Sequence, residues 1–282
     1  MQEAGFGGLR ILALENRRAT EIATLIRSCE GVPTVVPVMR EVPLESNEAA
    51  FTFAEALMAG QFDVVLFLTG AGARILFSAV LTRFPREDFF GALERTRIAV
   101  RGPKPIAALR EFGAAADIVS QEPSTWREVL ASLDASYPEG IRGLRIAVQE
   151  YGAVNAALLE GLEQRGAQVT SVPVYQWALS ENLDEIRATI GSLQRGEFDV
   201  LLFLTGIQAM HLCQVARDMG QLEPLLESLR RLVVVSIGPS TTEELAHQGI
   251  TPDFHPSHPK MGIMVREAAN AALHLLEGKR TG

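Results

Sequence analysis

The chain has 282 residues, 47% hydrophobic and 21% charged, and a formal net charge of -8. This length suits two globular domains, each with its own core, and the composition is typical of globular proteins. The negative charge disfavours broad nucleic-acid binding, and no apolar run approaches the roughly 20 residues that span a membrane. The first ten residues lack a basic stretch followed by an apolar one, and both cysteines lie in helical patterns, so we expect a cytoplasmic protein without disulfides.

Short apolar runs alternate with helical patterns along the whole chain. This alternation predicts an α/β protein whose parallel strands are covered by helices on both faces. Between the strands, 154–165 is a typical helix, with an apolar stripe and Gly166 as its left-handed stop. The expected strands are, in chain order, Leu9–Leu14, Thr34–Val38, Val64–Leu68, Arg97–Val100, Ala116–Val119, Leu144–Val148, Val169–Val172, Val200–Leu204, Val233–Ile237 and Pro252–Phe254.

One phrase occurs twice, as FDVVLFLTG at 62–70 and as FDVLLFLTG at 198–206, an offset of 136 positions. Other landmarks return at the same step, among them a Gly-Pro pair at 102 and 238 and a Val-Pro-Val tripeptide at 36 and 172. Two similar α/β units therefore make up the chain, and a ligand site between them is the default expectation. The repeat alone would place the boundary near residues 137–142.

Four turns follow expected strands, at the edge where parallel sheets usually bind ligands. Two of them offer a threonine hydroxyl and glycine at a helix start, and two place Gly-Pro before a helix. A simpler interpretation is that they are ordinary helix starts, with Ser240 or Thr241 as a cap. The candidate anion-binding residues are Arg17, Thr69, Gly70, Gly72, Arg101, Gly102, Lys104, Thr205, Gly206, Gly238, Ser240 and Thr241.

Other motifs in the chain are weak. The glycines after Thr69 lack the third glycine of a dinucleotide fingerprint, because Ile75 stands in its place. His255 and His258 are each followed by proline and have no acidic or cysteine partner nearby, which disfavours a metal site. We therefore expect neither a metal nor a cofactor.

Three stretches resemble the uroporphyrinogen-III synthase family. They are the Phe-Leu-Thr-Gly turn, SIGPSTTEELAHQGITPDF at 236–254 and QRGAQVTSVPVYQWAL at 164–179, with a terminal helix after Pro259. The resemblance covers nearly the whole chain and implies two flavodoxin-like, doubly wound parallel-sheet lobes joined by a two-segment extended hinge. It implies lobe one at 1–39 and 177–282 and lobe two at 40–176, which replaces the boundary suggested by the repeat.

The resemblance also implies an activity. Members of the family dehydrate and cyclise hydroxymethylbilane, inverting ring D, to give uroporphyrinogen III, which implies a carbon-oxygen lyase. Tyr175 stands where the family carries a tyrosine implicated in activity, and its phenol is implied to donate a hydrogen bond to the departing hydroxyl. Tyr151 and Gly152 are implied to contact the substrate. Pro105 and Gly72 depart from relatives that have threonine and arginine there, which leaves individual side-chain contacts open.

The partners implied by the resemblance are the anionic bilane and, transiently, hydroxymethylbilane synthase, with no nucleic acid and no membrane. A cytoplasmic monomer is expected. Two alternatives stay open. The chain could be a two-lobed tetrapyrrole or small-molecule binding or regulatory module without catalysis, or a two-lobed glycosyltransferase, although it has no convincing nucleotide-sugar motif.

Overall fold

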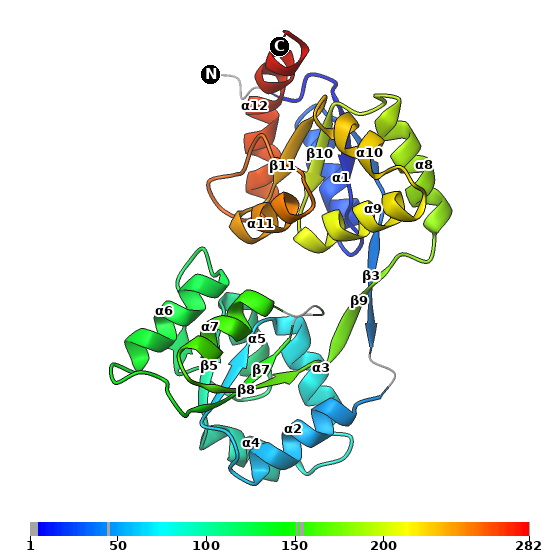
Figure 1. Cartoon of the computed structure of the whole chain (residues 1–282). Coiled ribbons are helices and arrows are strands. Elements are labelled where there is room, and N and C mark those ends of the chain that lie inside the picture. Colours follow the sequence, from blue (N-terminus) through cyan, green and yellow to red (C-terminus); the bar gives the residue numbers. More distant parts are fainter. Residues whose placement is uncertain (1–4, 44–45, 151, 153–154, 282) are drawn as a thin grey trace. The chain divides into compact units, whose positions relative to one another are not determined.

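The computed structural model describes residues 5–43, 46–150, 152 and 155–281 (Figure 1). The chain divides into two compact units. The split unit comprises Met1–Arg40 and Ala178–Gly282, and the continuous unit comprises Glu41–Trp177. Residues 137–142, where the two sequence repeats meet, lie inside the continuous unit, so the repeats and the units are not the same division.

The split unit is built on a four-stranded sheet in the order β11-β10-β1-β2, and its neighbouring strands are parallel. Helices α1 and α12 contribute the apolar side chains on one face, and α8 to α11 contribute those on the other. Burial on both faces explains why β10 and β11 are almost entirely apolar. The elements are β1 (Arg10–Ala13), α1 (Ala19–Ser28), β2 (Val32–Val35), α8 (Leu183–Gln194), β10 (Val200–Phe203), α9 (Gly206–Asp218), α10 (Leu222–Leu229), β11 (Val233–Ser236), α11 (Pro239–His247) and α12 (Met261–Thr281).

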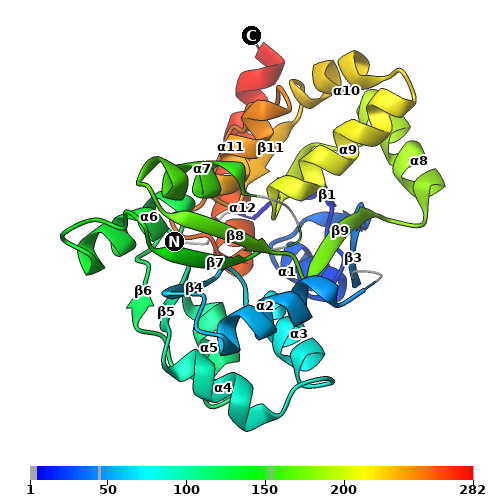
Figure 2. The same ribbon diagram turned by 60° about the horizontal axis from the view of Figure 1, so that its bottom comes forward.

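The continuous unit is built on a five-stranded parallel sheet in the order β6-β5-β4-β7-β8. Figure 2 shows α2 to α5 on one side of this sheet and α6 and α7 on the other, in agreement with the two apolar clusters. The elements are α2 (Glu48–Met58), β4 (Val64–Phe67), α3 (Gly70–Val80), α4 (Arg86–Glu94), β5 (Arg97–Val100), α5 (Pro103–Glu111), β6 (Ile118–Val119), α6 (Trp126–Ser136), β7 (Arg145–Gln149), α7 (Ala156–Gln164) and β8 (Gln168–Val172).

Two extended segments lead from one unit to the other. They are β3 (Met39–Pro43) and β9 (Tyr175–Leu179), which pair with each other as a separate two-stranded sheet. Each follows a copy of the repeated Val-Pro-Val tripeptide. The α/β class and the two parallel sheets expected from the sequence are confirmed.

Some expected elements differ in detail. Pro252–Phe254 is not a strand, because only a single parallel bridge joins Phe254 to Val235. The strand expected at Thr34–Val38 is β2, which lies earlier in the chain, from Val32 to Val35, so Val36–Val38 are not part of it. Helix α7 begins after Asn155, whose side chain accepts a hydrogen bond from the Leu158 N–H at 3.1 Å, and Val154 lies outside the described residues.

Candidate active site

The first copy of the repeated phrase contains Thr69, which follows the carboxyl end of β4. Thr69 caps helix α3, because its hydroxyl oxygen accepts a hydrogen bond from the Gly72 N–H at 3.0 Å. The same oxygen lies 3.5 Å from the hydroxyl oxygen of Tyr175, at the outer limit of hydrogen bonding. Thr69 is therefore a helix cap and also the point where the phenol reaches the turn.

The ring of Tyr175 is held from several sides. Its side chain is 3% exposed, and its ring meets that of Trp177 edge to face at a centroid distance of 5.6 Å. Gly152 lies against both rings, with a φ of +87° and no room for a side chain, because a Cβ would come within 2.7 Å of each ring. The Trp177 N–H also donates to the Gly152 carbonyl at 3.1 Å. Gly152 is thus required by the aromatic pair, while Tyr151 lies outside the described residues.

Gln149, at the end of β7, belongs to the same cluster and was not singled out from the sequence. Its side chain is 1% exposed, and its Oε1 lies 3.4 Å from the Thr69 N–H nitrogen. Its Nε2 donates to the Glu150 carbonyl. A side chain at position 72 would collide with this amide, so Gly72 leaves the space that Gln149 fills.

Glu150 follows Gln149 and is buried on the other face of the sheet, with 2% of the residue exposed. The Ser171 hydroxyl donates to its Oε1 at 2.9 Å, and its Oε2 has no partner among the described residues. Burial raises the pKa of this carboxyl, although the hydrogen bonds from Ser171 and the Asn155 backbone act in the opposite direction. Sequence reasoning missed Glu150 because a single glutamate after a strand usually lies in solvent.

Two of the candidate glycines allow helices to approach closely. A Cβ at Gly70 would lie 2.5 Å from the Lys104 carbonyl oxygen in α5, and a Cβ at Gly206 would collide with Glu244 in α11. Gly102 precedes Pro103, the first residue of α5, and is its N-cap. These glycines have packing roles that do not depend on a ligand.

The second copy of the phrase, in the split unit, fills its turn differently. Gln208 of α9 accepts hydrogen bonds at Oε1 from the N–H groups of Leu204 and Thr205, at 2.8 and 3.4 Å. Its Nε2 donates to the Leu14 carbonyl at 2.6 Å. The amide that comes from strand β7 in the continuous unit thus comes from helix α9 here.

The start of α11 corrects one interpretation of the sequence. Its N-cap is Gly238, without a side-chain cap, so neither Ser240 nor Thr241 is a cap. The turn is held instead by Ser236, whose hydroxyl donates to the Gly238 carbonyl at 3.1 Å and accepts from the Thr242 hydroxyl at 2.9 Å.

The candidate residues fall into two groups. One group follows β5 and so lies at the same carboxyl end of the sheet as Thr69; it consists of Arg101, Gly102 and Lys104. Lys104 is exposed, and Arg101 is half-buried. The other group lies at the corresponding edge of the split unit and consists of Arg17, Thr205, Gly206, Gly238, Ser240 and Thr241.

The residues that the structure describes contain no group of three or more His, Cys, Asp or Glu side chains placed to hold a metal ion. None of their helices is both long enough and apolar enough to span a bilayer.

The sequence model of a family described as "Uroporphyrinogen-III synthase HemD" matches residues 20–266. The chain belongs to the uroporphyrinogen-III synthase family. This match covers most of both units, including every turn described above. The chain is thus related to enzymes of tetrapyrrole synthesis along most of its length.

Relatives and solved structures agree with the family. The chain is 28% identical to a putative uroporphyrinogen-III synthase of Methanothermobacter thermautotrophicus, over 83% of this chain and 87% of the relative. It is 29% identical to an uncharacterized protein, YjjA, of Bacillus subtilis, over 94% and 96%. A crystal structure of a mutant uroporphyrinogen III synthase of Thermus thermophilus matches with a TM-score of 0.72 and 26% identity, over 96% of this chain and 100% of the other. These findings support the synthase function and do not favour the binding-module alternative.

Proposed function

We propose that this protein is a uroporphyrinogen-III synthase that acts as a cyclising hydro-lyase on hydroxymethylbilane. The observation that carries the proposal is the buried Tyr175 phenol, 3.5 Å from Thr69 at the carboxyl end of β4, in a chain of this family. The enzyme would receive the unstable bilane in the cytoplasm, by transient contact with hydroxymethylbilane synthase.

The chemistry needs a proton donor for the leaving group. When the terminal C–O bond of the bilane breaks, the electrons of a pyrrole nitrogen stabilise the carbon, and the departing hydroxide needs a proton to leave as water. A phenol has an ordinary pKa near ~10, so it is protonated at neutral pH and can donate a hydrogen bond to that oxygen. The electron-rich substituted carbon of ring D then attacks this electron-poor carbon, and rearrangement of the resulting spiro intermediate inverts the ring. Tyr175 acts in the first of these steps.

The second requirement is to hold the carboxylate arms of the substrate. Helices α3 and α5 both begin at the carboxyl end of the continuous unit's sheet, and the first N–H groups of a helix have no partner within the helix. In α3 the Gly72 N–H is capped by Thr69, and in α5 Pro103 and Pro105 have no N–H, so the other first-turn N–H groups are the candidates. Helix N-termini attract anions because the backbone dipoles add there. Arg101 and Lys104, next to the start of α5, add positive charge. A chain with a net charge of -8 can therefore bind an anionic substrate locally.

Replacing Tyr175 with phenylalanine tests the proposal. Because the ring stays in place, we expect the unfolding temperature to stay nearly unchanged, while turnover falls at least about tenfold, as for loss of a proton donor. The assay mixes the protein with fresh hydroxymethylbilane, oxidises the products and separates type I from type III uroporphyrin. Tyr137→Phe is the matched control, since Tyr137 follows α6 and lies outside the cluster around Thr69.

Two outcomes would contradict different parts of the proposal. Unchanged turnover in the Tyr175→Phe variant would end the role of the phenol but leave the synthase function intact. Only type I product from folded wild-type protein would end the synthase function and favour a binding module.

A further inference from the structure

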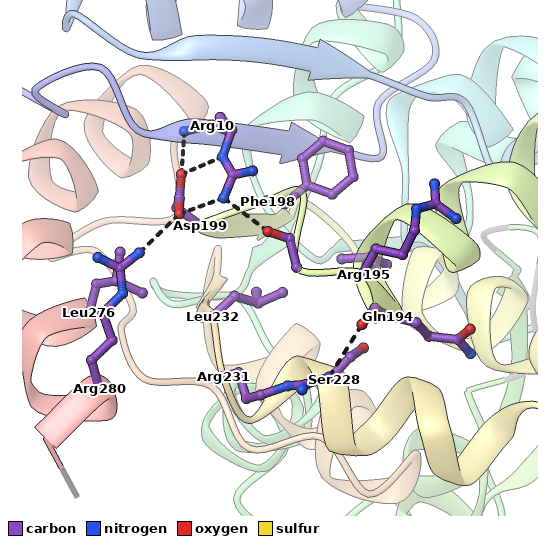
Figure 3. Close-up of a pocket in the computed structure, with 12 residues that line it drawn as sticks. Arg10, Gln194, Arg195, Phe198, Asp199, Ser228, Arg231, Leu232, Leu276 and Arg280 are labelled. Atoms are coloured by element: carbon purple, nitrogen blue, oxygen red, sulfur yellow. Dashed lines mark hydrogen bonds and ion pairs between the residues drawn. The ribbon is translucent and has the colours of Figure 1, made fainter.

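A cavity of about 160 Å³ lies in the split unit (Figure 3). It lies at the amino-terminal end of the sheet, whereas the turns described above lie at the carboxyl end. Its walls come from the amino-terminal ends of β1, β10 and β11, from the carboxyl-terminal ends of α8 and α10, and from α12. The turns after Leu204 and Ile237 lie at the other ends of β10 and β11. The cavity is therefore separate from the candidate active site.

The lining of this cavity is positively charged. Arg10, Arg231 and Arg280 line it, and among the described lining residues Asp199 is the only acid. Arg195 also lines it but pairs with Glu197 at 2.6 Å, so that pair is neutral. Three guanidinium groups and one carboxylate therefore line the cavity, which leaves a surplus of two positive charges in a chain that is acidic as a whole.

Two of these arginines are only lightly engaged. Arg10 is firmly bound, with its Nε 2.9 Å from Asp199 Oδ2 and its Nη2 3.0 Å from the Gly196 carbonyl oxygen. Arg231, in contrast, makes one long contact of 3.4 Å to the Gln194 carbonyl oxygen. Arg280 makes one, also 3.4 Å, to Asp199 Oδ1. Arg231 uses one N–H donor on the last carbonyl of α8. Most N–H donors of Arg231 and Arg280 therefore remain for a ligand.

A comparison of the two units shows which charges of the cavity belong to the shared fold and which occur only in the split unit. In the continuous unit, Arg145 and Asp63 reproduce the Arg10–Asp199 pair with a shortest distance of 2.7 Å. Arg95 stands one offset away from Arg231. No counterpart of Arg280 exists among the described residues there, because α6 has 11 residues whereas α12 has 21 and carries Arg280 in its additional turns. The ion pair thus belongs to the fold, and the extra arginine is specific to the split unit.

Size and chemistry restrict what the cavity can hold. A water molecule occupies about 30 Å³ in the liquid, so the cavity has room for about five waters or one phosphate-sized ion, and a tetrapyrrole is too large. Two surplus positive charges match a dianion. Guanidinium groups bind phosphoryl oxygens through paired N–H donors. The buried Ser228 hydroxyl also lines the wall, but it donates to the Leu225 carbonyl at 2.6 Å, so the arginines are the donors for an anion.

We propose that this cavity, the arginine pocket formed by Arg10, Asp199, Arg231 and Arg280, binds the phosphoryl group of a small dianion. Such a ligand bridges the last turns of α12 and the loop that precedes β11. It therefore stabilises the split unit against unfolding, since it binds only the folded form.

The test is a titration of the protein with inorganic phosphate at constant ionic strength, followed by unfolding temperature and by calorimetry. We expect a saturable rise in the unfolding temperature, and Arg231→Gln and Arg280→Gln should each weaken binding about tenfold or more. The matched control is Arg95→Gln, which changes the equivalent of Arg231 in the continuous unit and should leave the response unchanged. Glycerol phosphate serves as a second probe, and tighter binding than inorganic phosphate would identify a phosphomonoester as the ligand.

Two results would overturn the proposal. A rise in unfolding temperature that continues with phosphate concentration without saturating would mean non-specific ion binding. A saturable response that persists in both arginine variants would place the phosphate elsewhere, for example at a helix N-terminus. Both variants concern exposed side chains, and calorimetry reports binding even if one of them lowers the unfolding temperature.

Discussion

The turn after β4 and the turn after β10 have nearly the same nine-residue sequence, yet the glutamine that hydrogen-bonds to each turn comes from a different element. In the continuous unit, the amide of Gln149 reaches the turn from strand β7, and Gly72 on the helix leaves room for it. In the split unit, the amide of Gln208 comes from the helix, and the strand contributes only the Leu14 backbone. Positions 72 and 208 are equivalent in the repeats, as are 14 and 149.

This exchange shows which part of the repeat is structural. Both turns need one amide to satisfy the backbone at the end of the central strand, and the two units supply it from opposite sides. The hydroxyl-bearing ring, in contrast, occurs once, because Met39 stands in β3 where Tyr175 stands in β9. The backbone support is duplicated, whereas the candidate proton donor is not.

The largest predicted effect comes from making the two turns alike. Gly72→Gln should destabilise the continuous unit by about 3 kcal/mol, because the new side chain collides with Gln149. Adding Gln149→Leu recreates the Gln208 and Leu14 arrangement and should restore most of that loss. Unfolding in urea of the two single variants and the double variant measures the coupling. If the double variant were as unstable as Gly72→Gln alone, the idea that the two units supply the same amide from opposite sides would be contradicted.

The next effect compares the two Arg–Asp pairs. The Asp199 side chain is 9% exposed and that of Asp63 is 35% exposed, so Asp199→Asn should cost about 2 kcal/mol and Asp63→Asn less than about 1 kcal/mol. In each case the hydrogen bond from the arginine, opposed by desolvation, holds the aspartate pKa below its ordinary value. This stabilisation is present above the ordinary pKa of aspartate and is lost as the pH falls through the lowered pKa.

Unfolding temperatures measured from neutral pH into acid test this order. The gap between Asp199→Asn and wild type should close as the pH falls, since protonated aspartate no longer pairs with Arg10. A larger loss from Asp63→Asn than from Asp199→Asn would contradict the argument from burial.

The smallest predicted effect concerns Glu150, whose pKa is raised by burial. A carboxyl with a raised folded pKa stabilises the protein below its ordinary pKa, and that stability is lost as the pH rises through the folded value. Glu150→Gln should therefore raise stability at neutral pH, by less than about 1 kcal/mol, and flatten its dependence on pH. Glu160→Gln, on the exposed surface of α7, is the control. Identical pH profiles for Glu150→Gln and wild type would show that this carboxylate ionises freely.

The sequence predicted the strands and turns well because both depend on local patterns. The apolar runs around Val65 and Leu201, the glycines that end helices and the repeated Thr-Gly each report on their own surroundings. Pro252–Phe254 fails as a strand because pairing depends on a neighbour, and only Val235 forms a bridge with it.

The site could be predicted only in part, because its contacts join distant segments. Thr69 was found from its turn, and Tyr175 from the family resemblance. Gln149 was missed because nothing local marks a glutamine at a strand end as buried. An alignment of the two repeats did contain a signal. The helix position holds Gly72 in the continuous unit and Gln208 in the split unit, whereas the strand-end position holds Gln149 and Leu14, respectively.

The split unit also has a consequence for synthesis on the ribosome. Strand β1 lies between β2 and β10, and Ile11 is paired with Val200. The whole continuous unit is made between these two strands, so at ordinary translation rates β1 waits on the order of ten seconds or more for its neighbour. During that time the continuous unit already has all five of its strands. Its sheet can therefore form first, while the apolar β1 and α1 remain without the partners that cover them.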